Sequence, residues 1–512
     1  MTEATQNSYD DVLYAGYPFV QAHPDRLATV AALFGLKTAS VEQCRVLEIG
    51  CGDGANLIPM ALSLPESKFV GVDLAARYIK EGQAVAEALG LANITLQQLD
   101  ILDLSPDFGQ FDYVIAHGIY SWVPAAVRDK LIAICKANLA PDGVAYVSYN
   151  TYPGGHLREM MREMMLFHIR DVEQPAERIA QARAMVRFLA ESESGPELYR
   201  MTLKSFDQEV GRLSDGSLFH DHLAEVNSPV YFNQFVDHAR RHGLKYLAEA
   251  DFFDMQYETF APEISETLRR IADDDIVACE QYLDFLTCRR FRQTLLCHEQ
   301  VAVDRELNPE RVTNLFIASS AYAVSGEPVI DSTAVEMFKG MKGASLSTNH
   351  PLTKAAMLQL GRIWPASLHF NDLIDAARQE LNPGLARNNG DVGRDDALRL
   401  AGFLLKAYGA NLIELHSHRS NFVLEAGTHP TASRLARLQL EKSTTVTTMR
   451  HTSVQVMDPV GRRLLALLDG TRDRKALLDE LGGLVEEEKL AHLADKLEQN
   501  LSAIARLALL VA

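Results

Sequence analysis

The chain has 512 residues, which is too long for one compact domain at about 150 residues per domain. Hydrophobic residues make up 47% and charged residues 23%, a globular composition that excludes a mostly disordered chain. The formal net charge of −18 argues against binding to nucleic acid or to an anionic membrane, because both attract a cationic face.

The first residues and the cysteines favour a soluble, cytoplasmic protein. Residues 1–8 are polar and lack the apolar core of a signal peptide, and no uncharged apolar run reaches the roughly 18 residues of a membrane span. The six cysteines contain no CxxC pair and no metal-ligand spacing. We therefore expect reduced thiols and no metal site.

Strand and helix patterns alternate through the first 150 residues. Strand patterns cover 45–49, 68–73, 94–100, 111–116 and 144–149, helical patterns cover 56–64, 75–89 and 127–139, and a turn is expected at 141–143. This alternation predicts an α/β fold with a parallel, doubly wound sheet.

A glycine cluster follows the first predicted strand, where such a fold binds its ligand. Gly50, Gly52 and Gly54 would let the backbone approach a ligand closely. The dinucleotide-binding fingerprint GxGxxG needs its third glycine at position 55, which is Ala55. The cluster therefore departs from a dinucleotide site.

Two acidic residues flank the glycine cluster. Glu48 precedes Gly50 by two positions, and Asp73 ends the next strand, where it can accept hydrogen bonds from ribose hydroxyls. A cleft with two carboxylates and no Lys or Arg in its loop would repel a pyrophosphate. It suits S-adenosylmethionine, which carries an ammonium and a sulfonium.

The run Glu48-Ile49-Gly50-Cys51-Gly52-Asp53-Gly54, followed by Asp73, resembles motif I and the acidic residue after it in class I S-adenosylmethionine-dependent methyltransferases. The resemblance implies that the glycines line the methionine end of the cofactor, Glu48 orients its amino group and Asp73 holds its ribose. Asp100 and Ile101 would flank the adenine. The residues expected to bind the cofactor are Tyr17, Glu48, Gly50, Cys51, Gly52, Asp53, Gly54, Asn56, Asp73, Leu74, Asp100, Ile101 and His117.

The resemblance also implies a Rossmann-like seven-stranded sheet, whose last pieces are displaced along the chain. A helical pattern at 229–241, strands at 244–249 and 291–297, and a helix at 274–285 supply them. We therefore expect a discontinuous catalytic domain, residues 1–154 and 228–300, with a helical insertion at 155–227. The insertion opens with a methionine-rich helical stripe, which is expected to pack within the chain or across a homodimer, beside the substrate.

Four further segments narrow the resemblance. Residues 117–124, 149–154, 227–232 and 281–294 are similar to bacterial methyltransferases with a methyltransferase regulatory domain, a group that includes rickettsial protein lysine methyltransferases. The similarity covers about the first 300 residues and, more loosely, the rest. The chain departs from the pattern at Gly155, where a large aromatic residue is expected. The resemblance therefore does not define the shape of the substrate pocket.

The last third predicts two α+β modules. Residues 301–425 are expected to form a winged-helix-like regulatory domain, and residues 426–512 a second winged-helix-like domain with the turn Asp469-Gly470-Thr471. Winged helices often bind DNA, but the acidity of the chain favours contact with protein.

The candidate catalytic residues are His117, Tyr120, Tyr149 and Asn150, which follow or end strands at the cleft edge. His117 either deprotonates a nucleophile or only hydrogen-bonds its loop. Tyr120 and Trp122 could face the sulfonium or a substrate ammonium through their rings, and Trp122 could instead simply pack. Tyr149 and Asn150 are expected at the substrate rim.

Three other features have competing interpretations. Tyr17 belongs to an aromatic segment with Tyr9, Tyr14 and Phe19 that forms either a lid over the cofactor or an anchor beneath the sheet. His220-Asp221-His222 lacks a fourth ligand and is expected to be a polar turn. Cys51 is expected to be a small residue that fits the loop, rather than a nucleophile.

Together these features predict an S-adenosylmethionine-dependent methyltransferase that modifies lysine side chains of a protein. An acidic surface would attract a lysine-rich protein substrate, and a desolvated cleft would lower the lysine pKa from its usual value near 10.4. The alternatives are a small-molecule N- or O-methyltransferase and a cofactor-binding scaffold without turnover.

Overall fold

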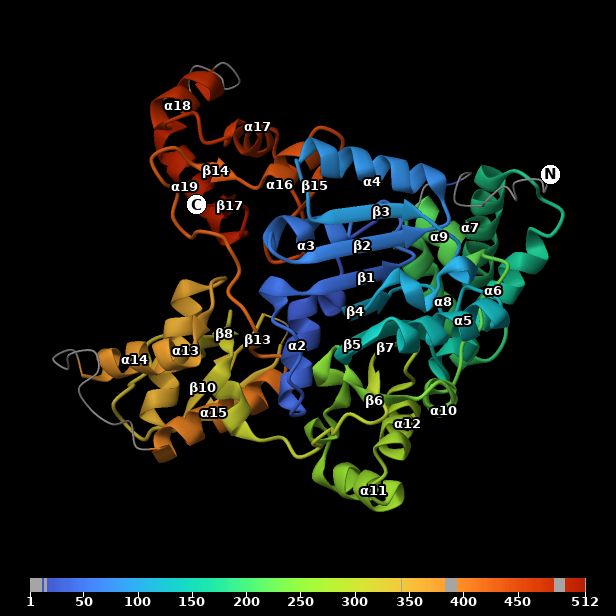
Figure 1. The fold of residues 1–512 in the computed structure, drawn as a ribbon, viewed down its shortest axis with the longest axis horizontal. Coiled ribbons are helices and arrows are strands. Elements are labelled where there is room, and N and C mark those ends of the chain that lie inside the picture. Colours follow the sequence, from blue (N-terminus) through green and yellow to red (C-terminus); the bar gives the residue numbers. More distant parts are fainter. Residues whose placement is uncertain (1–11, 13–15, 342, 383–393, 483–492, 512) are drawn as a thin grey trace.

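The structure is a computed structural model that describes residues 12, 16–341, 343–382, 394–482 and 493–511. Its centre is a seven-stranded sheet in the order β3-β2-β1-β4-β5-β7-β6 (Figure 1). The strands are β1 (Arg45–Ile49), β2 (Lys68–Asp73), β3 (Ile94–Gln98), β4 (Phe111–Ala116), β5 (Leu139–Asn150), β6 (Leu244–Glu249) and β7 (Phe291–His298). This confirms the expected seven-stranded, Rossmann-like sheet.

The direction of the strands fixes where a ligand can bind. Strands β1 to β5 are parallel, and β7 runs antiparallel between β5 and β6. The strand order reverses between β1 and β4, so their carboxyl ends flank the crevice where open α/β sheets bind ligands. β1 is almost wholly buried, as its run of apolar residues predicts for a strand covered on both faces.

Helices cover both faces of the sheet. They are α2 (Pro24–Leu33), α3 (Leu57–Ser63), α4 (Ala76–Ala88), α5 (Ala125–Ala137), α10 (Phe232–Arg241) and α12 (Ile276–Thr287), while α11 (Pro262–Ala272) packs on α12. Among the described residues, no helix is long and apolar enough to cross a membrane.

The turn expected at residues 141–143 is part of β5. Phe111 pairs with Leu139 and Tyr113 with Val144, so the β5 side carries extra residues that bulge out of the ladder. The strand resumes its register beyond the bulge, which turn chemistry alone could not show.

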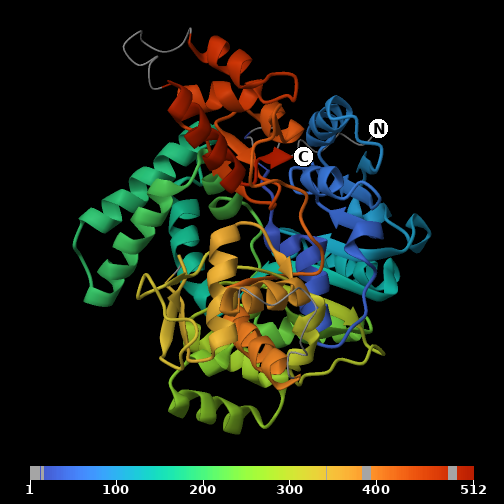
Figure 2. The same cartoon turned by 90° about the vertical axis from the view of Figure 1, so that its left-hand side faces the viewer.

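The expected helical insertion is present. It consists of α6 (Gly154–His168), α7 (Pro175–Glu191), α8 (Glu197–Arg212) and α9 (Asp215–His222), and Figure 2 shows α6 to α8 projecting from one side of the molecule. Met161 and Met165 are buried in a core that these helices share with Ile179 and Leu203, so the methionine stripe packs within the chain.

The remaining residues form two smaller units. The first holds β8 (Phe316–Ala318), β9 (Tyr322–Ala323), β10 (Glu336–Lys339), β11 (Ser345–Thr348), β12 (Leu368–His369) and β13 (Glu414–His416), with α13 (Pro351–Ile363), α14 (Phe370–Leu381) and α15 (Arg394–Gly409). Its buried side chains, such as Met357 and Leu404, belong to the same apolar core as the large sheet.

The second unit has its own core, which includes Leu464 and Leu501. It contains β14 (Thr431–Ala432), β15 (Thr445–Thr447), β16 (Ser453–Gln455) and β17 (Leu510–Val511), with α16 (Arg434–Gln439), α17 (Pro459–Leu467), α18 (Arg474–Gly482) and α19 (Leu493–Arg506). β15 and β16 form an antiparallel hairpin, and the unit lies beside α3 and α4 (Figure 1).

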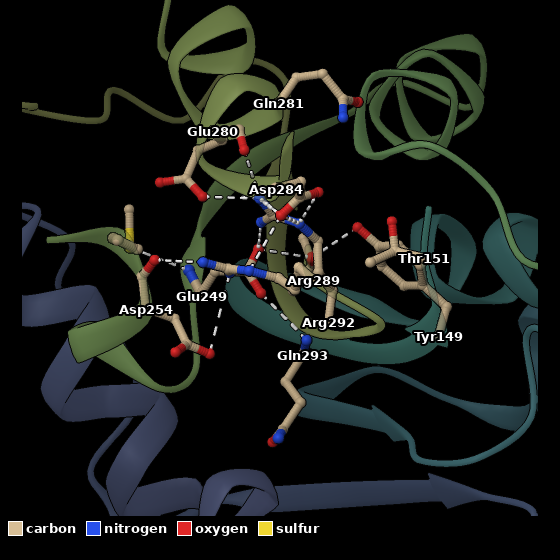
Figure 3. Close-up of polar contacts among 12 residues, drawn as sticks. Tyr149, Thr151, Glu249, Asp254, Glu280, Gln281, Asp284, Arg289, Arg292 and Gln293 are labelled. Atoms are coloured by element: carbon tan, nitrogen blue, oxygen red, sulfur yellow. Dashed lines mark hydrogen bonds and ion pairs between the residues drawn. The ribbon is translucent and has the colours of Figure 1, made fainter. Parts of the chain in front are cut away.

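A buried ion cluster holds β7 between its neighbours (Figure 3). Arg292 on β7 is almost fully buried and pairs with Glu249 of β6 at 2.6 Å. It also pairs with Glu280 at 3.0 Å and Asp284 at 2.9 Å, both on α12. Because one guanidinium serves carboxylates from two other elements, the cluster fixes the antiparallel strand against β6 and α12.

Candidate functional site

The glycine loop begins where β1 ends. A Cβ atom on Gly50 would lie 2.2 Å from the Ile119 side chain, and the φ angle of 72° also favours glycine there. The backbone nitrogen of Gly52 donates a hydrogen bond of 2.9 Å to Asp73 Oδ2. These contacts tie the loop to the carboxyl end of β2.

Glu48 lies buried on β1, just before the loop. Its Oε1 accepts a 2.8 Å hydrogen bond from Asn56 Nδ2, while its Oε2 is buried with no hydrogen-bond partner among the described residues. Burial raises the pKa of the Glu48 carboxyl to about 8. A buried carboxyl with one oxygen unpaired is suited to receive a cation.

Asp73 and Asp53 add two more carboxylates to the crevice. Asp73 Oδ1 accepts a hydrogen bond from the backbone nitrogen of Ala75 at 2.8 Å, and Asp53 Oδ1 accepts one from Ala55 at 3.1 Å. Burial raises the pKa of both carboxyls. The crevice thus has acidic groups of the kind that a sulfonium and a ribose need.

The other residues predicted to bind the cofactor lie in this loop or just after the carboxyl ends of β2 and β3. Cys51 is buried, and burial raises the pKa of its thiol well above the usual value, so it stays a thiol. Leu74 is 56% exposed. Asp100 caps a short 3₁₀ helix by accepting from the nitrogen of Leu102, and Ile101 packs against the core.

The segment before α2 passes over the glycine loop. A Cβ atom on Gly16 would lie 2.5 Å from Asp53 Oδ1, and the nitrogen of Phe19 donates to Asn56 Oδ1 at 2.9 Å. Tyr17, between these two contacts, is 45% exposed. This path is consistent with a lid; Tyr9 and Tyr14 lie outside the described residues.

His117 follows β4 and stacks on the ring of Phe19, with ring centroids 3.7 Å apart. Its Nδ1 is hydrogen-bonded to the hydroxyl of Tyr146 at 2.8 Å, and that hydroxyl donates to Gln293 Oε1 at 3.0 Å. Burial lowers the pKa of His117 to about 4, so the ring is neutral at pH 7. Sequence reasoning missed Tyr146 and Gln293, which lie in strand interiors.

Tyr120 and Tyr149 lie in a buried aromatic cluster with Phe235 of α10. Tyr149 stacks on Phe235 at 4.0 Å, and its hydroxyl bonds to Thr294 at 3.0 Å. The hydroxyl of Tyr120 bonds to Nδ1 of His238 at 2.9 Å. The structure therefore places both tyrosines among packing partners. Their cluster is separate from the stack of His117 on Phe19.

Asn150 and the neighbouring polar groups form a separate cluster at the end of β5. The side-chain nitrogen of Asn150 donates to Asn227 Oδ1 at 2.7 Å, and its backbone nitrogen donates to Ser121 Oγ at 2.8 Å. Gly155 lies just beyond, where an added Cβ would come within 3.2 Å of both Pro229 and Tyr152. A large side chain at 155 would have to displace these two residues.

The histidine pair singled out in the sequence lies in α9. His220 Nε2 is hydrogen-bonded to the carbonyl of Val12 at 2.7 Å. Within the described ranges, the group that brings three metal-ligating side chains together is a different one: Asp129, His238 and His242. Both imidazoles bond to the same oxygen of Asp129, at 3.1 and 2.8 Å.

One residue at the site comes from the far end of the chain. His451 Nε2 is hydrogen-bonded to Asn56 Oδ1 at 2.8 Å, and both side chains are buried. The separation of 395 residues leaves no local sequence signal for this contact.

Three family models match the chain. A methyltransferase domain matches residues 46–143, a predicted methyltransferase regulatory domain matches 214–298, and a PKMT C-terminal winged helix domain matches 429–509. The second range includes β6 and β7 of the central sheet. Residues 301–425, where we expect a regulatory module, lie outside these three ranges.

Similar proteins occur in Rickettsia. An uncharacterized protein of Rickettsia prowazekii is 35% identical over 502 residues, covering 96% of this chain and 88% of that protein. The solved structure of PKMT2 from Rickettsia typhi matches with a TM-score of 0.85 and 25% identity, covering 98% of this chain and all of that one. A structure of the same protein in complex with AdoHcy matches equally well.

Proposed function

Because the chain belongs to the class I S-adenosylmethionine-dependent methyltransferases with a methyltransferase regulatory domain, we propose that it methylates lysine side chains of a protein. The observation that carries this proposal is the match to PKMT2 over 98% of the chain, since PKMT denotes a protein lysine methyltransferase. The PKMT winged helix model at 429–509 supports it independently of the catalytic domain.

The residues of the crevice fit S-adenosylmethionine, the cofactor of this class. Glu48, with a buried and unpaired oxygen, would hold the amino group, and Asp73 would accept from the ribose hydroxyls. When bound, the cofactor supplies an electrophilic methyl carbon: the lysine nitrogen forms the new C–N bond as the S–C bond breaks, and the thioether takes the electron pair. An added Cβ on Gly52 would meet no heavy atom within 4 Å, so the loop leaves open space for the cofactor at this position.

The lysine nitrogen must lose a proton before it can attack, because its usual pKa is near 10.4. His117 is a poor acceptor for that proton, since burial lowers its pKa to about 4. We assign it a positioning role, because its ring stacks on Phe19 and its Nδ1 is hydrogen-bonded to the hydroxyl of Tyr146. Desolvation of the lysine then favours the neutral amine, and water accepts the proton.

A labelled-methyl assay tests this proposal. The full chain is incubated with methyl-labelled S-adenosylmethionine and, in parallel, with cell-lysate proteins and with a small-metabolite fraction. The proposal predicts label in protein, lost in the Asp73→Ala variant. Label in the metabolite fraction alone would instead support a small-molecule methyltransferase, and cofactor binding without any label would support a scaffold.

We also propose that the enzyme is a homodimer that pairs through its insertion. The helices α6, α7 and α8 expose large apolar side chains, namely Phe167, Phe188, Leu198 and Met201. Light scattering on the full chain distinguishes one copy from two. A Phe188→Glu change is expected to shift the protein toward the monomer, whereas a wild-type monomer at micromolar concentration would refute the pairing.

A further inference from the structure

We propose that the C-terminal winged-helix domain sets the affinity for the cofactor through His451, a positioning residue that holds the Asn56 amide in the orientation facing Glu48. The inference rests on the proposed role of Glu48 as the partner of the cofactor amino group. It goes further by assigning a function in the cofactor site to the distant domain.

The geometry of Asn56 is the first step. Its Oδ1 accepts two hydrogen bonds, from the backbone nitrogen of Phe19 at 2.9 Å and from His451 Nε2 at 2.8 Å. Its Nδ2 donates to Glu48 Oε1 at 2.8 Å. A side-chain amide has one accepting and one donating end, so two donors at the oxygen leave the nitrogen toward Glu48.

The state of His451 is the second step. Burial holds the pKa of His451 well below its usual value, so the ring is neutral and carries one N–H. The contact to Asn56 Oδ1 requires that this hydrogen be on Nε2. If the amide turned over, Phe19 and His451 would both meet an NH₂ group, and Glu48 would meet an oxygen.

The third step is how the domain presents His451. The residue lies at the tip of the hairpin formed by β15 and β16, with a left-handed φ angle of 57°. Its nitrogen donates to Thr448 across the tip. Thr447 and Met449 line a small cavity together with Pro59 of α3, the helix that begins after Asn56. The wing of the winged helix thus reaches the cofactor loop.

Three further contacts hold the wing in place. The ring of His23, at the start of α2, meets the ring of His451 edge-on at 5.0 Å. Arg450, the residue before His451, lies over the ring of Trp364 at 4.2 Å and pairs with Glu414. The hairpin tip is therefore anchored to the catalytic domain and to the residues after β7, and a shift of either would move His451.

The consequence concerns Glu48, whose carboxyl is proposed to bind the amino group of the cofactor. Without His451 the amide of Asn56 keeps one of its two fixed donors and can turn, so Glu48 loses its only charge-stabilising hydrogen bond among the described contacts. A carboxyl that ionises less readily binds an ammonium more weakly. The chemical step, which takes place at the sulfonium, is not touched.

The test compares variants of the full chain by calorimetric titration with S-adenosylmethionine and by turnover at saturating cofactor. His451→Ala is expected to raise Kd about tenfold, the effect of one buried hydrogen bond, while kcat stays within about twofold. His451→Gln, which keeps a donor, is expected to recover most of the affinity. Ser453→Ala, an exposed position on the same hairpin, serves as the matched control.

A double-mutant cycle makes the test specific. The double variant Asn56→Ala/His451→Ala is expected to have nearly the same Kd for S-adenosylmethionine as Asn56→Ala alone, because both changes break the same hydrogen bond. Full additivity, or an unchanged Kd in His451→Ala, would overturn the inference. If Glu48→Gln also leaves Kd unchanged, the role proposed for Glu48 fails instead. If the alanine variant does not fold, the glutamine variant and the Asn56→Ala background decide the question.

Discussion

Glu48 and Asn56 form a 2.8 Å hydrogen bond that uses one oxygen of the buried carboxyl and leaves the other unpaired among the described residues. Burial without a cation raises the pKa of Glu48 to about 8, so the site holds a neutral acid before the cofactor binds. The buried, half-paired carboxyl lowers the stability of the free protein, and an ammonium bound beside it raises that stability.

The first prediction concerns Glu48→Gln. The folded pKa of about 8 lies above the ordinary 4.5, so the folded protein binds more protons, and its stability falls as pH rises from about 4.5 to about 8. The glutamine variant removes this penalty. We expect a higher Tm than wild type at pH 8, no difference near pH 4.5, and cofactor affinity weaker by roughly 10- to 100-fold.

Differential scanning fluorimetry and calorimetric titration measure both effects. Glu87→Gln, an exposed position on α4, serves as the control and is expected to change neither. A glutamine variant with unchanged affinity and a lower Tm at pH 8 would contradict a role for a buried acid in cofactor binding.

The second prediction is that cofactor binding releases a proton. Glu48 is protonated in the free protein below pH 8 and ionises beside the incoming ammonium, so close to one proton leaves per cofactor at pH 6.5. Titrations in buffers with different ionisation enthalpies measure this number. Proton uptake, or a heat independent of the buffer, would contradict the ionisation of Glu48 on binding.

The third prediction separates a positioning role of His117 from a role as a base. Since burial lowers its pKa to about 4, His117→Asn should lower kcat by about tenfold while leaving the shape of the pH–rate profile unchanged. Steady-state rates from pH 6 to 9 provide the measurement. Loss of a limb near pH 6.5 in the variant would identify His117 as the base.

The glycine loop and the sheet were accessible from the sequence because their signals are local. Gly50 and Gly52 adopt φ angles of 72° and 55°, and the apolar run of β1 precedes them directly. The seven-stranded sheet with its displaced last strands was predicted correctly. The expected turn at 141–143 was wrong because a bulge keeps these residues within β5.

The contacts that organise the site were not accessible in the same way. Tyr146 sits mid-strand and looks like ordinary core, yet its hydroxyl holds His117. His451 lies in a polar segment near the end of the chain, and only the packing of the last domain brings it to Asn56. Arg292 and its three carboxylates resemble a solvated surface in sequence, although the structure buries them.

The fourth prediction addresses that cluster. Arg292→Met removes the cation that pairs with Glu249 at 2.6 Å and with Glu280 at 3.0 Å, and both carboxyls stay buried. Breaking a buried ion pair from one side typically costs about 3–5 kcal/mol, so we expect a large drop in Tm. Arg240→Met, on an exposed ion pair with Asp237, is expected to change stability by at most about 1 kcal/mol. Equal effects of the two changes in chemical denaturation would show that the cluster is not structural.

The position of the transferred methyl group tests the central claim most directly. Proteins labelled by the full chain with deuterated S-adenosylmethionine are digested and sequenced by tandem mass spectrometry, with Asp73→Ala as the control. A protein lysine methyltransferase places the label on lysine Nζ in the wild-type sample and not in the control. Label confined to another side chain, or found only in small molecules, would contradict the account.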